Sequence, residues 1–447
     1  MKIILILAPL LLLSACNQDQ LDKTLGLSQP TRTPIQKSNP ANCPQWDSGA
    51  TIKVTESITI PKGCHYDKVT FTISKSNITF DCNGAELNGL GKTKMNEFYR
   101  RYKVAEVPRN TAFTISGSEN NFLENVTVKN CHLRFYINGF NISFGLKQAT
   151  HDDLKAGRNV EALENHLRTL SPKNIRIENN EIIKSHKAGI FVQRYITDLI
   201  VNNNTIDRAA DMGIYLESGT QRITISNSTF SKNGDSTYDL EERKRKPRVR
   251  KREAIAVDSS AYNIFKNNKF INNAGGAIFM YKNCYERYKE AKQLPRYQGS
   301  NFNLIENNYF SDEVKGVWIA SRQSRDLNNF KCGDPVIQTK DSEKYYEDFA
   351  KNNRVINNTF ENTEKAVIVE DDKNTISNNR FILGKNTRKD IIIGTTGEVT
   401  NVHNVDGTIV RDNVFSAKQP AVWLRFNPTG SLFSGNKPPV SVVESSK

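Results

Sequence analysis

The sequence is poor in the residue patterns from which common catalytic sites are built. Its six histidines are scattered, and none of its seven cysteines forms a Cys-x-x-Cys pair, so a local zinc or redox motif is missing. It also has no glycine-rich phosphate loop and no Gly-x-Ser-x-Gly elbow. Phosphate binding by a P-loop and acyl transfer by an elbow serine are therefore excluded as sequence-level hypotheses.

Acidic charge and long apolar runs are scarce as well. Lysine and arginine number 62 against 48 aspartates and glutamates, a net charge of +14, which predicts a polyanionic partner such as acidic glycan, lipopolysaccharide or nucleic acid. The main apolar run, at positions 3–13 after Lys2, is too short for a membrane span. It has the layout of a secretory signal over residues 1–15. Because an exported protein is kept from nucleic acid, acidic polysaccharide is the expected partner.

The signal ends in Leu13-Ser-Ala-Cys16, which resembles the lipobox of bacterial lipoproteins. The resemblance implies that Cys16 is acylated and anchors the mature chain to the outer membrane, facing the periplasm or the cell surface. A plain signal peptide with a chance cysteine is the alternative. Residues 16–42 carry prolines among polar residues and predict a flexible tether. The six remaining cysteines, an even number in an exported protein, predict disulfides.

One short pattern recurs along the chain, apolar-x-apolar-x-Asn-Asn-x-Phe or Ile. Copies end at Ile182, Ile206 and Phe230, and others at Phe360 and Phe381, with the spacing of a β-solenoid coil. Asparagine tolerates a left-handed φ and its amide can bond to neighbouring coils, so these asparagines are predicted to be structural.

A second alternating strand follows each copy and is usually opened by Gly or Ala. Such alternation predicts one buried and one outward face. The buried set is predicted to stack coil upon coil and consists of Ile190, Val192, Ile214, Leu216, Ile255, Val257, Ile278, Met280, Val317, Ile319, Val367 and Val369.

In this repeat the chain resembles the pectin-lyase-like superfamily of right-handed parallel β-helices. The resemblance implies an all-β fold, a single-stranded right-handed parallel β-helix with loop and short-helix insertions. We assign it to residues 43–436, follow it with a tail at 437–447, and expect a monomer. This fold hosts lyases, hydrolases, epimerases, esterases and binding proteins, so it does not fix the function.

The alignment of the coils also suggests a disulfide pattern, one of 15 pairings that six cysteines allow. Two cysteines fall at nearly the same point of successive coils, two would close the N-terminal cap, and two would join insertions. The predicted pairs are Cys82–Cys131, Cys43–Cys64 and Cys284–Cys332.

Four insertions interrupt the coils, and long connections are where function is expected. Residues 144–173, 282–301 and 321–352 follow the second strand of their coils, and residues 231–252 precede it. We expect them to wall the outward face of that strand column into a groove.

Three of these insertions carry local signals. The spacing of apolar residues from Val160 to Leu170 predicts a helix that packs on the solenoid. Residues 341–349 predict a second, short helix. Residues 243–252 include eight basic residues in ten, a pattern typical of a polyanion-binding patch or of a solvated loop.

The outward positions form two columns along the predicted groove. Aromatic rings in a row suit stacking on sugar faces, although rings also stack on one another along solenoids. We therefore assign substrate binding to Phe191, Tyr215, Phe279, Trp318 and Arg322. The first column reads Phe191, Tyr215, Ala256, Phe279, Trp318, Ile368, Trp423, and the second reads Gln193, Glu217, Asp258, Tyr281, Ala320, Glu370, Arg425.

Glu217 and Asp258 fall on adjacent coils, so their carboxyl groups could approach to ~5 Å. Two carboxylates so close need a compensating cation, proton or substrate. They could hold Ca²⁺, act as acid and nucleophile of a retaining glycosidase, or simply be solvated. All three alternatives remain open.

Uronate β-elimination and C5 epimerisation need a cation, a base and an acid. Arg194 or Arg322 suits the first role, Lys282 or Lys187 the second, and Tyr281 the third. The leading hypothesis is therefore a lyase or epimerase acting on an acidic polysaccharide. A non-catalytic glycan-binding lipoprotein is the alternative, and a glycoside hydrolase is the third.

Family signatures narrow this choice only slightly. The Asp-Pro-His-Asp of mannuronan epimerases, the Asp-Asp and Gly-His-Gly of polygalacturonases and the Arg-x-Pro-x-x-Arg of pectate lyases are absent. Calcium-dependent lyases of the chondroitinase B and alginate lyase type stay compatible, because their Lys, Arg and paired acids lack a tight local motif.

Overall fold

The computed structural model describes residues 39–89, 110–235, 251–290, 293–324, 332–334, 337–338, 344–395, 405–416, 422–425, 428–440 and 442–444. The signal segment, Cys16, most of the tether and positions 243–250 of the basic run lie outside these residues. The first strand of the solenoid begins at Thr51. Among the described residues no helix has the length and apolarity needed to cross a membrane.

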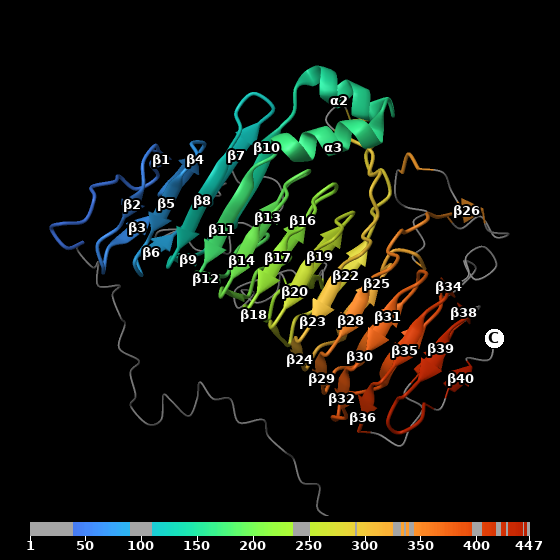
Figure 1. Cartoon of the computed structure of the whole chain (residues 1–447). Helices are drawn as coiled ribbons and strands as arrows, with labels where there is room; N and C mark the ends of the chain where they lie inside the picture. The colour runs from blue at the N-terminus through green and yellow to red at the C-terminus, as the bar shows by residue number, and fades with distance from the viewer. Residues whose placement is uncertain are drawn as a thin grey trace, which may run out of the picture. The chain divides into compact units, whose positions relative to one another are not determined.

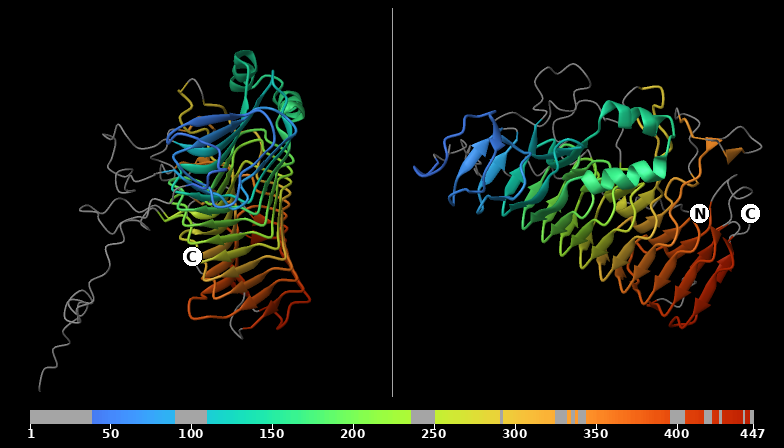
Figure 2. Two further views of the ribbon diagram at one scale, coloured as in Figure 1. Left: turned by 90° about the vertical axis from the view of Figure 1, so that its left-hand side faces the viewer. Right: turned by 45° about the horizontal axis from the view of Figure 1, so that its top comes forward.

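The solenoid consists of three long parallel sheets, here called sheets A, B and C, and successive strands of the chain enter them in that order (Figure 1). Each strand pairs with the equivalent strand of the next coil, so the coils lie side by side along one axis (Figure 2). Sheet A holds the outward columns predicted above. Its strands are β1 (Thr51–Val54), β4 (Thr70–Ile73), β7 (Thr111–Ser118), β10 (Asn138–Gly145), β13 (Ile190–Val192), β16 (Ile214–Leu216), β19 (Glu253–Asp258), β22 (Gly276–Tyr281), β25 (Lys315–Ile319), β30 (Lys365–Val369), β33 (Lys389–Ile393), β37 (Val422–Leu424) and β40 (Val442–Glu444).

Sheets B and C carry the Asn-Asn repeat at the turn between them. The strands of sheet B are β2 (Ile58–Thr59), β5 (Ile78–Asp81), β8 (Glu124–Lys129), β11 (Lys173–Glu178), β14 (Ile200–Asn202), β17 (Thr224–Ser226), β20 (Ile264–Lys266), β23 (Leu304–Glu306), β28 (Arg354–Ile356), β31 (Thr375–Ser377), β35 (Ile409–Arg411) and β39 (Leu432–Ser434). Those of sheet C are β3 (His65–Asp67), β6 (Glu86–Asn88), β9 (His132–Arg134), β12 (Glu181–Ile183), β15 (Thr205–Asp207), β18 (Thr229–Ser231), β21 (Lys269–Ile271), β24 (Tyr309–Ser311), β29 (Thr359–Glu361), β32 (Arg380–Ile382) and β36 (Val414–Phe415).

The core is a stack of inward side chains, one layer per coil. All twelve residues predicted for the buried set of sheet A have 0% exposure, so that prediction is confirmed. The Phe that ends each later repeat lies in sheet C and stacks on the Phe of the next coil. Neighbouring rings are nearly parallel, with centroids 4.6–5.2 Å apart. The stack comprises Phe230, Phe270, Phe310, Phe360, Phe381 and Phe415.

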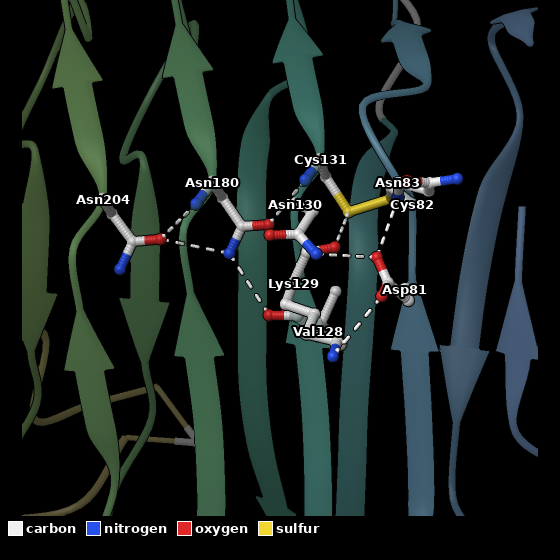
Figure 3. The surroundings of a disulfide bond; sticks show 9 residues. All are labelled: Asp81, Cys82, Asn83, Val128, Lys129, Asn130, Cys131, Asn180 and Asn204. Atoms are coloured by element: carbon white, nitrogen blue, oxygen red, sulfur yellow. Dashed lines mark hydrogen bonds and ion pairs between the residues drawn. A yellow bond between two sulfur atoms is a disulfide. The ribbon is translucent and has the colours of Figure 1, made fainter. Parts of the chain in front are cut away.

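The two asparagines of each repeat have different roles, both structural as predicted. The first takes a left-handed φ at the sheet B to sheet C turn, as Asn179 does at 58° and Asn203 at 54°. The second is buried and bonds along the axis: the Asn180 Oδ1 accepts from the Cys131 N–H at 3.0 Å, and the Asn180 N–H donates to Asn204 Oδ1 at 2.9 Å (Figure 3). Buried backbone donors that no strand satisfies are thereby paired.

All three predicted disulfides are present, Cys43–Cys64, Cys82–Cys131 and Cys284–Cys332. Cys82 and Cys131 occupy the same position of neighbouring coils, 4.8 Å apart at Cα (Figure 3), the spacing of adjacent parallel strands. The Cys284–Cys332 bridge joins two of the insertions, as expected.

The insertions contain two helices, α2 (Gln148–Lys155) and α3 (Val160–Leu170). The second confirms the prediction from the apolar spacing, since Leu167 is fully buried in the core. The short helix predicted at 341–349 is wrong: β27 (Lys344–Tyr345) pairs antiparallel with β26 (Ile337–Gln338). Adjacent tyrosines favour extended chain, and pairing with another segment of the same insertion outweighed helix propensity.

The C-terminal end of sheet A includes one more strand than the sequence repeat indicated. Strand β40 pairs with β37, which continues sheet A beyond position 436. A short pair, β34 (Val405–Asp406) with β38 (Pro428–Thr429), lies parallel in the last coils. Strand β33 belongs to a coil that is missing from the two predicted columns of outward residues. Its segment Ile391-Ile-Ile follows Lys389-Asp390 and lacks the Gly or Ala that opens the other strands, so the repeat did not reveal it.

Candidate functional site

The predicted outward residues do share one face of sheet A. Register pairs Phe191 with Tyr215, and Phe279 with Trp318. Leu216 pairs with Val257, which places Glu217 beside Asp258 on the next coil. One correction applies to the first column, since Ile392 of β33 lies between Ile368 and Trp423.

The prediction of an open row of rings needs a larger correction. Ala256 has 0% exposure, Tyr281 1% and Ile368 1%, although all three occupy outward positions, and Phe279 is 8% exposed. Met212, Ala256, Phe279 and Tyr281 instead form an apolar cluster on the outer face of the sheet, flanked by Tyr215 and Trp318. Phe191, Tyr215, Trp318 and Trp423 stay half-buried. Within the first column, these four rings keep some exposure.

Two insertions meet along the side of this face where the sheet A strands end. The buried Arg168 of α3 donates to Gly219 O at 3.0 Å and to Gln298 Oε1 at 3.1 Å, and the Tyr297 hydroxyl donates to Leu154 O at 2.6 Å. Both helices lie beside the segment that follows β22 (Figures 1 and 2). The predicted wall thus exists on this side. The fourth insertion, expected on the other side, lies mostly outside the described residues.

Asp258 is fully buried and surrounded by donors. Its Oδ2 lies 3.2 Å from Arg296 Nε and accepts from the Tyr215 hydroxyl at 2.6 Å and from Asn283 Nδ2 at 2.7 Å. Burial raises the pKa of this carboxyl, but Arg296 and the neighbouring donors outweigh burial and hold the pKa below its ordinary value. Asp258 is therefore a charged carboxylate whose oxygens are already engaged.

Glu217 is also paired with an arginine. Its Oε1 lies 3.2 Å from Arg194 Nε, and Arg194 Nη2 also donates to Leu294 O at 3.3 Å. The compensation that a Glu217/Asp258 pair requires therefore comes from Arg194 and Arg296. Within the described residues, no group of three or more His, Cys, Asp or Glu side chains is arranged to hold a metal ion. Glu217 Oε1 and both oxygens of Asp258 are thus already in contact with protein donors.

A second buried network surrounds Tyr281. Its hydroxyl donates to Glu253 Oε1 at 2.9 Å, and Arg252 Nη2 lies 3.2 Å from the same Glu253 oxygen. Burial, reinforced by Glu253, raises the pKa of Tyr281 well above its ordinary value. Burial also acts to raise the pKa of Glu253, yet Arg252 outweighs it and lowers that pKa. Tyr281 is thus a neutral donor held by a carboxylate.

Arg322 covers this network from outside. Its guanidinium carbon lies 4.7 Å from the centroid of the Tyr281 ring, and its backbone N–H donates to Asp348 Oδ2 at 2.7 Å. The side chain is half-buried. The two residues to which substrate neutralisation and proton donation were assigned are therefore in contact.

The two candidate bases differ in their surroundings. Lys282 Nζ lies 3.0 Å from Asp334 Oδ2 and 5.8 Å from the Phe349 centroid, and the residue is almost fully buried. Lys187 is exposed in the segment before β13; its backbone N–H donates to Ile137 O at 2.9 Å, and its carbonyl accepts from the Asp211 N–H at 3.2 Å. Neither lysine is brought into hydrogen-bond contact with Tyr281 or Arg322.

Sequence reasoning missed Arg296, Arg252 and Glu253. Arg252 and Glu253 carried a usable signal, since Arg252 directly precedes β19 and Glu253 is its first residue. Arg296 carried none, because it lies in an insertion where no repeat fixes its position.

Part of the sequence matches a known protein family. Residues 62–251 match the family described as "Right handed beta helix region". This chain is a right-handed parallel β-helix. The finding confirms the fold that the repeat predicted, and no curated protein sequence matches the chain.

Solved structures resemble this β-helix only distantly. The Dettilon tailspike protein is 12% identical over 89% of this chain and 61% of its own, with a TM-score of 0.49. An alginate lyase from Paenibacillus sp. is 11% identical over 75% of this chain and 92% of its own, at 0.40. A Family 28 exopolygalacturonase from Yersinia enterocolitica is 14% identical over 89% and 72%, at 0.41. The β-helix spans less than two thirds of the tailspike, and likenesses at this level concern the fold alone.

Proposed function

We propose that this β-helix binds an extended acidic polysaccharide on the outward face of sheet A, with Arg322 as a receptor for a sugar carboxylate. The observation that carries the proposal is the pairing of the arginines. Arg194, Arg252 and Arg296 each lie 3.2 Å from a carboxylate. Among the described residues, the Arg322 guanidinium has no carboxylate oxygen within 4.0 Å.

A half-buried guanidinium without an anion is suited to receive one. Its planar donors fit a carboxylate in two parallel hydrogen bonds, and stacking on Tyr281 holds the plane in place. The rings nearest to this face that keep some exposure can support sugar rings. Phe191 and Tyr215 stack face to face with centroids 5.3 Å apart and planes 2° apart, so their ring edges form one apolar strip.

Replacing Arg322 tests this role. Arg322→Ala is expected to weaken binding of polyuronate oligomers about 10- to 100-fold, because hydrogen bonds to a charged group contribute ~1.5–3 kcal/mol and 1.4 kcal/mol is tenfold. Titration calorimetry measures the effect, and Arg322→Lys should restore part of it. Arg380→Ala, at an exposed position of sheet C, is the control with the same loss of charge. Unchanged affinity in Arg322→Ala would overturn the assignment.

Uronate lyase or epimerase activity is the second candidate, favoured by the contact between Arg322 and Tyr281. Binding ranks first because Tyr281 and Lys282, the acid and one base, are buried and already bonded. Incubation with alginate, chondroitin and pectate, with and without EDTA, followed by unsaturated-uronate absorbance, separates the two. An unsaturated product that the unmodified chain forms and Tyr281→Phe does not would establish catalysis. Loss of that product on adding EDTA would show that the reaction depends on calcium. Cleavage without a double bond would point to the glycoside hydrolase alternative at Glu217 and Asp258.

Export and anchoring are proposed on the signal and lipobox sequence alone. Cys16→Ser in the full chain is expected to move the protein from the membrane fraction to the soluble exported fraction, measured by fractionation and radiolabelled-palmitate incorporation. Acylation that persists in Cys16→Ser would remove this part of the proposal.

A further inference from the structure

Three lysines lie in register at the starts of neighbouring sheet A strands. Lys315 of β25 pairs with Lys365 of β30, which pairs with Lys389 of β33. Parallel strands are ~4.8 Å apart, and like charges directly opposite one another are destabilising. We call these three residues the lysine row. It lies at the opposite end of β25 from Arg322.

The two outer lysines of the row are held by aromatic rings. Lys315 Nζ lies 5.0 Å from the Trp318 centroid and 5.7 Å from that of Phe279. Lys389 Nζ lies 4.0 Å from the centroid of Trp423. Neither ammonium has a carboxylate within 4.0 Å among the described residues. Ring faces attract a cation without cancelling its charge, so these positions remain available to an anion.

The carboxylates around the row are too few to neutralise it. Lys365 Nζ lies 3.7 Å from Glu364 Oε1, and Arg388 shares that same oxygen at 3.7 Å. Arg425 is matched by Glu370 at 3.0 Å. Within 4.0 Å, and among the described residues, Lys315, Lys365, Lys389 and Arg388 thus share one carboxylate, that of Glu364, although Glu253 also acts on Lys315 from farther away.

The ammonium groups also influence one another. Burial, and then Lys365, lowers the pKa of Lys315. Burial, and then Arg425 and Lys365, lowers the pKa of Lys389. Lys365 is therefore the centre of a row of mutually repelling cations along the axis.

We infer that the lysine row is a second binding track, which takes a linear polyanion carrying one negative charge on every sugar, such as a polyuronate, laid along the axis of the β-helix. The inference rests on the proposed function and goes beyond it by assigning the charge spacing of the ligand. A sugar in an extended chain advances by about the same distance as one coil, so successive carboxylates can face successive lysines. Trp318 and Trp423 flank the track, and their rings hold Lys315 and Lys389 in place.

Polymers of different charge spacing test the track on the whole chain. Oligogalacturonate and oligomannuronate carry a carboxylate on each sugar, hyaluronan oligomers carry one on alternate sugars, and dextran oligomers carry none. Affinity is expected to fall in that order at equal length. Equal affinity for hyaluronan and oligogalacturonate would overturn the assigned spacing.

Single substitutions test the residues. Lys365→Ala is expected to weaken oligogalacturonate binding about 3- to 10-fold and to reduce the slope of log Kd against log salt by about 0.7–0.9, the value for one phosphate contact on a nucleic acid. It should also leave Tm unchanged or raise it slightly, because a repulsion is relieved. Lys269→Ala, exposed on sheet C, removes the same charge elsewhere and is expected to change neither affinity nor slope.

The two proposals fail in different ways. If the unmodified chain binds no polyuronate, both are overturned. If it binds and Arg322→Ala weakens binding but Lys365→Ala does not, only the lysine track is overturned. Equal weakening by Lys365→Ala and Lys269→Ala would show an effect of net charge alone and would also overturn the track.

Discussion

Asp258→Ala is expected to lower the free energy of unfolding by about 3–5 kcal/mol, the usual cost of removing one partner from a buried ion pair. Arg296 is buried against Asp258 at 3.2 Å, and the alanine would leave its charge without a carboxylate. The same change removes the acceptor of Tyr215 and Asn283. Chemical denaturation followed by circular dichroism measures the loss.

Two further variants identify the cause. Asp258→Asn keeps the shape but not the charge, so it should destabilise nearly as much. In Asp258→Ala/Arg296→Met the unpaired charge is gone, and we expect a substantial part of the loss to be recovered. A double variant as unstable as the sum of the single ones would contradict the ion-pair explanation. Arg222→Ala, on an exposed ion pair with Asp198, should cost at most about 1 kcal/mol.

The second large effect is a loss of stability as pH rises, caused by Glu313. This residue is 1% exposed, and burial raises its pKa from 4.5 to about 8. Its oxygens accept from the Asn273 N–H at 3.1 Å and from Asn273 Nδ2 at 2.7 Å. The folded chain therefore holds a proton that the unfolded chain has released.

The folded state binds this proton more tightly than the unfolded state, so raising the pH lowers the free energy of unfolding. Below pH 4.5 Glu313 is protonated in both states and its contribution is fully present. Between pH 4.5 and about 8 only the folded state keeps the proton, so stability falls by about 1.4 kcal/mol for each pH unit. Glu370, whose pKa burial raises to about 7, adds an effect of the same sign at lower pH.

Glu313→Gln isolates the contribution. Glutamine supplies the same acceptor to Asn273 without a charge, so Tm at pH 8 should rise by several degrees and the slope of stability between pH 5 and 8 should flatten. Glu306→Gln, on a partly exposed position of β23, is the control and should leave the slope unchanged. A pH slope equally steep in Glu313→Gln and in the unmodified chain would refute the assignment.

The fold was predictable because periodic contacts leave periodic residues. The second asparagine of each repeat exists to bond the next coil, and the terminal Phe exists to stack on its neighbour, so both recur at fixed positions. The burial of Glu313 could also have been predicted from the repeat. It stands three residues after Phe310, where Asn233 follows Phe230 and Asn273 follows Phe270.

The site was less predictable because its contacts cross between coils and insertions. Glu217 and Asp258 were correctly placed side by side, but Arg296 reaches Asp258 from 38 residues away along an insertion without repeats. The burial of Tyr281 and Phe279 was missed for the same reason, since alternation predicts which way a side chain points and says nothing of what covers it. The lysine row could have been found by aligning the residues that open β25, β30 and β33.

The disulfides cross-link the coils at the N-terminal end of the solenoid and leave the C-terminal coils without a cross-link. Cys43–Cys64 and Cys82–Cys131 fasten the first coils to one another, whereas the sequence has no cysteine after Cys332. A stack of coils opens most readily from a terminus, where each coil has one neighbour. Heat, force or a protease should therefore peel this molecule in one direction, from the last coils toward the first, while the N-terminal end is the last part to lose its shape.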